Sequence, residues 1–321
     1  MTLVATSSRI ATPSTGQTAD RFFRGMTLFF AVFVLLLLVG IIGGLVVGTF
    51  PVLRKEGLGF FVSTDWNPVT EEFGALPPIY GTLITSFIAL LLAVPVSFGI
   101  AIFLTELAPW WLRRPVGTAV ELLAAIPSII YGMWGLFVFV PFFRDYVEPG
   151  VSDSLGQVPI IGDLFNGPPL GIGIAAAGII LAIMVVPFIA AVMRDVFETV
   201  PAVLKESAYG IGCTTWEVVW KVVLPYTRVS VIGGIMLGLG RALGETMAVT
   251  FVIGNAHDIS ASLFLPGATI SSTVANEFSE AVGDIYPSAL MGCGLALFFI
   301  TFVVLALARP LLARLDKKAG K

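Results

Sequence analysis

Six long apolar runs constrain the fold of this chain more than any other feature. A helix needs about 20 mainly apolar residues to cross the hydrocarbon core of a bilayer, and each run meets that length. The chain has 321 residues, of which 57% are hydrophobic and only 12% charged, whereas soluble domains carry about 25% charged residues. The sequence therefore predicts an all-α, polytopic membrane protein whose six transmembrane helices lie at residues 26–50, 79–104, 116–143, 170–193, 229–254 and 286–308.

The segments outside the first and last runs are polar. Residues 1–25 are rich in Ser and Thr, and we expect them to form a disordered tail. The first run ends without a small-residue cleavage site, so it is interpreted as an uncleaved membrane helix rather than a signal peptide. Residues 309–321 form a basic tail, which leaves residues 26–308 as one transmembrane domain.

Lysine and arginine are distributed unequally between the loops. With the N-terminus placed in the cytosol, only Arg54, Lys55 and Arg144 fall in outside segments, and Arg241 lies within a run. The remaining 14 of the 18 basic residues fall in inside segments. Because cytoplasmic loops carry the excess of Lys and Arg, the sequence predicts that both termini are cytosolic.

The outside segments are acidic instead, since they hold twelve of the 21 Asp and Glu residues. Such a surface would repel a free anion, so an anionic substrate would have to be delivered by another protein. Acidic residues that merely keep the loops soluble explain the pattern equally well.

The inside loop between the fourth and fifth runs has the pattern of a helical hairpin. Pro201 suits the first turn of a helix, and Val203, Leu204 and Ile211 share one apolar face at helical spacing. Gly212 is expected to end that helix, because glycine is common just past a helix C-terminus.

A second short helix is expected after this glycine. Thr214 and Glu217 have the spacing of a capping box, and Pro225 is expected to stop the helix. We therefore predict a compact hairpin over residues 201–225. Its aromatic side chains fit either the core of a protein interface or a helix lying among membrane headgroups; they are Tyr209, Trp216 and Trp220.

Arg241 and Glu245 are two charges within the fifth run. A charged side chain at the centre of a membrane helix costs about 2.5–3.5 kcal/mol on insertion scales. Residues four apart share a helical face, so we expect these two side chains to meet. Three interpretations remain open: an ion pair that fixes packing, a proton or ion relay, and a substrate site in which the guanidinium contacts an anion.

The third run contains the sequence AIPSIIYG at residues 125–132. Pro127 followed by Ser128 predicts a kink in which the hydroxyl group satisfies freed backbone groups. A pore-lining role for this segment is the alternative.

The hairpin resembles the EAA motif of ABC importer permeases, with the family's spacing at every anchor. The departures are Ser207 for the middle alanine and Val222 for isoleucine. In that family the loop is the coupling helix that fits a groove on a cytosolic ATPase. The resemblance therefore implies an ATPase-coupling role for the residues at motif positions, which are Glu206, Ala208, Gly212, Leu224 and Pro225.

The stretch GRALGETMAV at 240–249 resembles the C-type permease subunit of bacterial Pst phosphate importers. Two further stretches resemble the same subunit, ELLAAIPSIIYGMWG at 121–135 and FFVSTDWNP…FGALPPIYGTLITS within 60–86. The resemblance implies the architecture of a type I ABC importer permease. It also places Arg241 and Glu245 in the pathway of phosphate.

The same resemblance implies partners and a location. They are a sister transmembrane permease, a cytosolic ATPase dimer that binds ATP and Mg²⁺, an extracytoplasmic phosphate-binding protein and the lipid of a bacterial inner (plasma) membrane. The chain lacks the nucleotide-binding pattern GxxxxGK[ST]. We therefore expect it to bind no cofactor, to perform no enzymatic step and to bind no nucleic acid.

Other functions fit part of the pattern. A permease for sulfate, molybdate or amino acids would also use an intramembrane arginine. An ATP-independent anion transporter is disfavoured by the EAA spacing and by the lack of a second, inverted half; co-purification of an ATPase would decide. A purely structural or regulatory subunit would tolerate loss of the Arg241 charge.

Overall fold

The computed structural model describes residues 15–159 and 162–319, so residues 1–14 of the predicted tail lie outside the described residues. The chain divides into two parts, Met1–Val47 and Gly48–Lys321. Helix α1 (Thr15–Glu56) begins in the first part. The prediction of disorder is wrong for residues 15–25, which are helical. No proline interrupts the sequence between Pro13 and Pro51, so the helix of the first apolar run extends toward the N-terminus.

The second part is almost entirely helical. Its long helices are α2 (Leu76–Ile102), α7 (Ile174–Glu198), α10 (Leu224–Leu243) and α13 (Ile285–Ala319). The shorter helices are α3 (Trp110–Ala124), α4 (Ser128–Trp134), α5 (Val140–Phe142), α6 (Glu148–Leu155), α8 (Ala202–Gly210), α9 (Thr215–Val218), α11 (Met247–Ile253) and α12 (Ile270–Glu277). Two short strands, β1 (Trp66–Asn67) and β2 (Glu72–Phe73), pair antiparallel.

Several helices contain or continue into wider or tighter turns. Turns of the π type, in which the backbone bond spans five residues, occur at Phe103–Leu107, Gly135–Phe139, Phe143–Val147 and Val219–Val223. Turns of the 3₁₀ type occur at Gly57–Phe61 and Gly162–Leu164.

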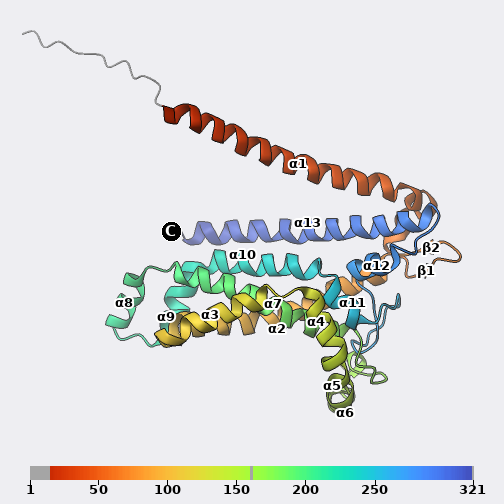
Figure 1. The fold of residues 1–321 in the computed structure, drawn as a ribbon. Coiled ribbons are helices and arrows are strands. Elements are labelled where there is room, and N and C mark those ends of the chain that lie inside the picture. The colour runs from red at the N-terminus through yellow and green to blue at the C-terminus, as the bar shows by residue number, and fades with distance from the viewer. Residues whose placement is uncertain (1–14, 160–161, 320–321) are drawn as a thin grey trace, which may run out of the picture. The chain divides into compact units, whose positions relative to one another are not determined.

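The second part has two distinct ends (Figure 1). The long helices α2, α7, α10 and α13 lie beside one another, with α8 and α9 at one end and β1, β2 and α12 at the other. The C-terminal end of α13 lies on the side of α8 and α9. This arrangement separates the hairpin from the β1–β2 end by the length of a membrane-spanning helix.

The number of membrane spans agrees with the prediction. Five helical segments of the described chain are long and apolar enough to cross a bilayer, and the pair Trp110–Ala124 and Ser128–Leu155 makes a sixth if it counts as one bent span. The protein is therefore a multi-pass helical membrane protein.

Two predicted spans are interrupted. The kink predicted at Pro127 is a break, since the helices on either side differ in direction by 88°. A proline disfavours helical conformation in the preceding residue, which explains the position of this break. The prediction of one continuous helix over 229–254 is wrong, because α10 ends at Leu243 and α11 begins only at Met247.

Helices α2 and α7 form the centre of the core through small residues. Gly178 allows Ile88 to approach so closely that an added Cβ would lie 2.6 Å from its Cγ2 atom. The hydroxyl group of Ser97 donates a hydrogen bond of 3.0 Å to the carbonyl oxygen of Val186. Small residues and polar bonds between backbones are the usual means of helix association in membranes.

A second cluster at the β1–β2 end is organised by the carboxylate of Glu277. It accepts hydrogen bonds from the indole N–H of Trp66 at 2.8 Å and from the hydroxyl group of Tyr286 at 2.7 Å. Nε2 of His257 lies 2.6 Å from the other carboxylate oxygen, and the His257 ring stacks on Trp66. Burial raises the pKa of Glu277, but the bonds from His257, Tyr286 and Trp66 and the attraction to His257 outweigh it, so the pKa lies below its ordinary value.

Candidate functional site

The two interrupted spans meet at their breaks. Gly132 on α4 packs against α11, where an added Cβ would lie 2.9 Å from the carbonyl oxygen of Met247 and 3.1 Å from Cα of Ala248. A residue with a side chain would therefore force the two helices apart. The close packing of α4 on α11 brings together two chain segments that sequence analysis treats separately.

Arg241 lies in the last turn of α10, immediately before the second break. Its guanidinium carbon lies 5.6 Å from the centre of the Phe188 ring on α7, a cation–π distance. Its Nε atom is buried and has no hydrogen-bond partner in the described part of the chain. A buried donor without a partner is costly, so this site favours the arrival of an acceptor.

The predicted contact between Arg241 and Glu245 is not formed. No acid lies within ion-pair distance of Arg241 among residues 15–159 and 162–319. The helix ends at Leu243, so Glu245 no longer shares its face. The carboxylate of Glu245 instead accepts a hydrogen bond of 3.1 Å from the backbone N–H of Ala248 and caps the start of α11.

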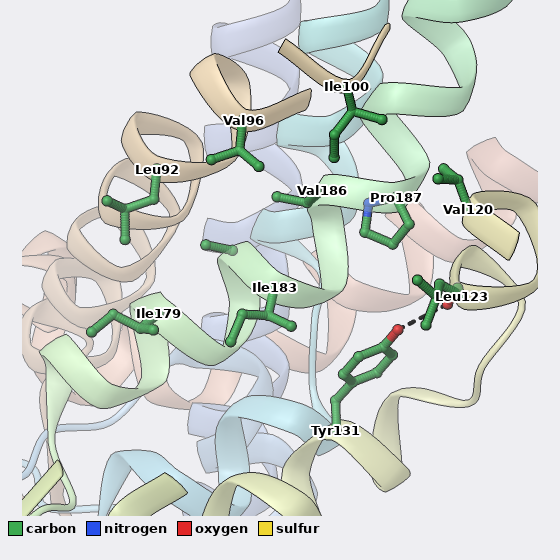
Figure 2. A pocket seen from close by; sticks show the side chains of 11 residues that line it. Leu92, Val96, Ile100, Val120, Leu123, Tyr131, Ile179, Ile183, Val186 and Pro187 are labelled. Carbon is green, nitrogen blue, oxygen red and sulfur yellow. Dashed lines mark hydrogen bonds between the residues drawn. The ribbon is translucent and has the colours of Figure 1, made fainter. Parts of the chain in front are cut away.

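Tyr131 bridges the first break. Its hydroxyl group donates a hydrogen bond of 2.9 Å to the carbonyl oxygen of Leu123, which closes the gap between α3 and α4 (Figure 2). Tyr131 on α4 thus fastens the two halves of the broken third span to each other.

An apolar cavity of about 380 Å³ lies beside Tyr131, between α2, α3 and α7. Figure 2 shows that its walls carry aliphatic side chains, among them Val96, Val120 and Ile183. These walls offer almost no polar group to an anion. In this region the guanidinium of Arg241, rather than the cavity, has the chemistry to bind a negatively charged ligand.

A polar cavity of about 300 Å³ lies near the cytosolic hairpin predicted from the sequence, and Arg113, Arg114 and Glu121 are among its lining residues. Arg194 at the end of α7 also lines it and bonds Glu121 on α3 at 2.6 Å and Asp195 at 2.9 Å. This arginine is therefore already paired with acids and fastens α3 to α7.

The hairpin itself forms as predicted at its turn. Thr214 and Glu217 make both bonds of the capping box at the start of α9. Gly212 has a φ of +91°, a conformation that residues with a side chain adopt only with strain. Ala208 lies on α8 and is buried in the same apolar cluster as Val218 and Val223 from the second half of the hairpin. The small residue at this motif position is explained by that packing.

The predicted end of the second hairpin helix at Pro225 is wrong. The chain continues from α9 through the π turn Val219–Val223 directly into α10. Pro225 lies in the first turn of α10, where a proline is tolerated. Leu224 and Pro225 therefore join the hairpin rigidly to the helix that carries Arg241.

The outer face of the hairpin is apolar and exposed. Val203, Ile211 and Trp216 are 70%, 84% and 67% exposed, and Glu206 also lies exposed beside them. The predicted apolar face of α8 thus points away from the core. Trp220 differs, because it packs against Trp216 and Phe98.

Sequence reasoning missed the bonds between distant charges. Lys205 pairs with Glu106, and His257 with Glu277. The first pair is separated by 99 residues, so no spacing rule could find it. The only available signal was the position of Glu106, a charged residue just beyond the predicted span at 79–104.

Comparison with known proteins identifies the family of this chain. The sequence pattern of the family described as "Binding-protein-dependent transport system inner membrane component" matches residues 97–321. The phosphate transport system permease protein PstC of Pasteurella multocida is 63% identical over 93% of both chains. The protein of the same name from Mesorhizobium japonicum is 59% identical over 98% of this chain and 96% of its own.

Solved structures show the same fold at low identity. A chain of a bacterial alginate ABC transporter, crystallised with its alginate-bound periplasmic protein, is 19% identical with a TM-score of 0.63 and covers 94% of this chain and 96% of its own. A chain of the MetNI methionine ABC transporter is 17% identical with a TM-score of 0.53, over 75% and 94%. The protein therefore belongs to the family of binding-protein-dependent transport system inner membrane components, as a PstC-like permease.

Proposed function

We propose that this chain is the transmembrane subunit of an ATP-driven importer of inorganic phosphate. The observation that carries the proposal is the likeness to PstC permeases over nearly the whole chain, at 63% and 59% identity. The geometry is consistent with it, since Arg241, whose buried Nε donor is unused among the described residues, lies next to the break between α10 and α11.

Arg241 is the proposed contact for phosphate. A guanidinium presents several donors in a plane and binds oxyanions through paired hydrogen bonds. An arriving phosphate would accept a hydrogen bond from the buried Nε–H group of Arg241. Its stay would be brief, because a single arginine holds it. Glu245 then has an indirect role in transport, because it caps α11 and so stabilises the conformation of the second break.

The hairpin over residues 201–225 is the proposed docking site for the ATPase dimer. Its exposed apolar side chains and Glu206 provide the contact surface, and Gly212, Leu224 and Pro225 fix the turn and its connection to α10. ATP and Mg²⁺ belong to that ATPase. This chain would itself bind no cofactor and perform no enzymatic step.

The remaining partners follow from the two ends of the second part. The hairpin end, with the C-terminal end of α13, would face the bacterial cytosol, and the distribution of Lys and Arg predicts that the N-terminus is cytosolic too. The β1–β2 end would receive an extracytoplasmic phosphate-binding protein, which explains how an anion reaches an acidic face. A sister permease would complete the pathway in the plasma membrane, and alternating access would move phosphate past Arg241.

Phosphate uptake by complemented cells tests the proposal. A strain that lacks this gene would receive the wild type, Arg241→Gln or Arg241→Lys at matched membrane levels. We expect the wild type to restore uptake and both variants to fail, because neither side chain has the donor geometry of guanidinium. Arg144→Gln is the matched control, since Arg144 is exposed and pairs only with its neighbour Asp145 among the described residues.

Sulfate or molybdate is the second candidate substrate, because a guanidinium binds any tetrahedral oxyanion. Uptake of labelled sulfate and molybdate by the same strains would separate the candidates. A wild-type protein that restores sulfate uptake but not phosphate uptake would refute the phosphate assignment and leave the ABC permease assignment in place.

A further inference from the structure

A buried ion pair joins the hairpin to the end of the second span. Nζ of Lys205 on α8 lies 2.5 Å from Oε1 of Glu106. The side chain of Glu106 is only 6% exposed and that of Lys205 18%. Charges removed from water to this degree are stable only when paired, so the two side chains depend on each other.

Glu106 is fixed to the end of α2 rather than to a free loop. It lies in the π turn Phe103–Leu107, which continues α2. In the same turn the hydroxyl group of Thr105 donates to the carbonyl oxygen of Ala101 at 3.0 Å. The backbone N–H of Ala108 closes the turn on the carbonyl oxygen of Phe103 at 2.7 Å. Any force on the carboxylate of Glu106 therefore acts on α2.

Lys205 occupies the inner face of α8. It lies three residues before the buried Ala208, whereas the neighbouring Glu206 lies exposed on the outer face. Within the part of the chain that the structure describes, the pair with Glu106 is the side-chain bond that connects α8 to a long helix. Two neighbouring charges on α8 therefore face opposite sides: Glu206 faces solvent and Lys205 faces the transmembrane helices.

Helix α2 in turn contacts the helix beneath Arg241. The bond from Ser97 to Val186 fastens α2 to α7, and Phe188 of α7 lies under the guanidinium of Arg241. A displacement of α8 would therefore reach the proposed phosphate contact through two fastened helices. A functional test measures whether this displacement reaches the pathway.

We propose that the Lys205–Glu106 pair transmits movement of the hairpin to α2 and thereby couples ATP hydrolysis to phosphate transport. Both residues are positioning residues, since they act through α8 and α2. The inference rests on the proposed function, because it assumes that the hairpin docks on an ATPase. It adds a second connection, beside the continuous helix from α9 into α10, between the docking surface and the pathway.

The test uses the complete importer in liposomes, with sister permease, ATPase and phosphate-binding protein. The variants are Lys205→Met with Glu106→Gln together, and the charge exchange Lys205→Glu with Glu106→Lys. The double neutral variant leaves no unpaired buried charge, so it separates loss of the bond from loss of stability. Arg144→Gln is the control, because it breaks an exposed pair with Asp145 outside the hairpin.

Two quantities decide the outcome: the ATPase retained on the permease and the phosphate transported per ATP hydrolysed. We expect the double neutral variant to retain the ATPase and to hydrolyse ATP, while phosphate per ATP falls about tenfold, since the bond that carries the movement is gone. The charge exchange should recover part of this loss, and Arg144→Gln should match the wild type.

A double neutral variant with the phosphate-to-ATP ratio of the wild type would overturn the inference, because the pair would then serve stability alone. A wild-type complex that shows no phosphate-dependent ATP hydrolysis would instead refute the proposed function. The two failures are therefore distinguishable in the same experiment.

Discussion

The carboxylate of Glu277 and the imidazole of His257 meet at 2.6 Å at the β1–β2 end of the protein. The same carboxylate accepts hydrogen bonds from a tryptophan on β1 and from a tyrosine on α13, so one acid on α12 fastens β1, which is distant in the sequence, to the start of α13. Its removal should loosen the face on which we propose that the phosphate-binding protein docks.

Glu277→Gln should lower the free energy of unfolding by about 1–3 kcal/mol at pH 7, because charge-assisted bonds to a buried carboxylate are lost. Since the pKa of Glu277 is lowered from its ordinary value of 4.5, its contribution is fully present above that pH and is lost as the pH falls through the lowered pKa. Melting of the detergent-solubilised proteins at a series of pH values from about 7 down to about 3 measures the difference. The exposed Glu280→Gln is the control, and an equal effect of both substitutions would contradict the prediction.

Gly132→Ala should destabilise the contact between α4 and α11. The added Cβ would lie 2.9 Å from the carbonyl oxygen of Met247, and overpacking of this kind costs about 1–3 kcal/mol. Gly99→Ala is the control, because an added Cβ there meets nothing within 4 Å and alanine favours a helix. Melting temperatures should fall for Gly132→Ala and stay level or rise for Gly99→Ala.

Glu245→Gln should retain most of the phosphate uptake, whereas Glu245→Ala should lose it. Glutamine keeps an oxygen that can accept the hydrogen bond from Ala248, and loss of a capping side chain costs about 1 kcal/mol. Uptake by cells with matched membrane levels provides the measurement. If glutamine proves as damaging as alanine, the charge of Glu245 matters and a relay or a transient pair with Arg241 returns as an explanation.

Gly212→Ala should weaken transport-dependent ATP hydrolysis. A residue with a side chain in this left-handed conformation costs about 1–2 kcal/mol, so the turn between α8 and α9 would shift. Gly210→Ala, two residues earlier, has a normal helical φ and free space around the added Cβ. Equal rates of hydrolysis in both variants would count against the role of this turn in docking.

The sequence predicted the features that depend on neighbouring residues. The apolar runs located the spans, the spacing of Thr214 and Glu217 located a cap, and Pro127 located a break. The contact of Arg241 with Glu245 failed because helical spacing applies only while the helix continues, and glycines at 240 and 244 lie where it ends. The predicted helix end at Pro225 failed for the opposite reason. The helix continues where the sequence predicts that it stops, because the preceding π turn accommodates the proline.

Contacts between distant segments were beyond sequence reasoning. Glu106 meets Lys205 only because α2 and the hairpin end at the same side of the helix bundle. Gly132 on α4 packs against Met247 on α11, which belongs to another span. These relationships depend on how helices pack, and no periodicity in one segment records the position of another.

The π turn at Val219–Val223 has a consequence for the relative rotation of two functional surfaces. A π turn inserts one residue into an α-helix and so offsets the sequence by about 100° around the axis. Trp216 belongs to the surface that we propose docks on the ATPase, and Arg241 is the proposed phosphate contact. The direction in which one faces relative to the other is therefore set by a single extra residue. Deleting this extra residue would leave the side chains of both surfaces unchanged but would rotate one surface relative to the other by about 100°.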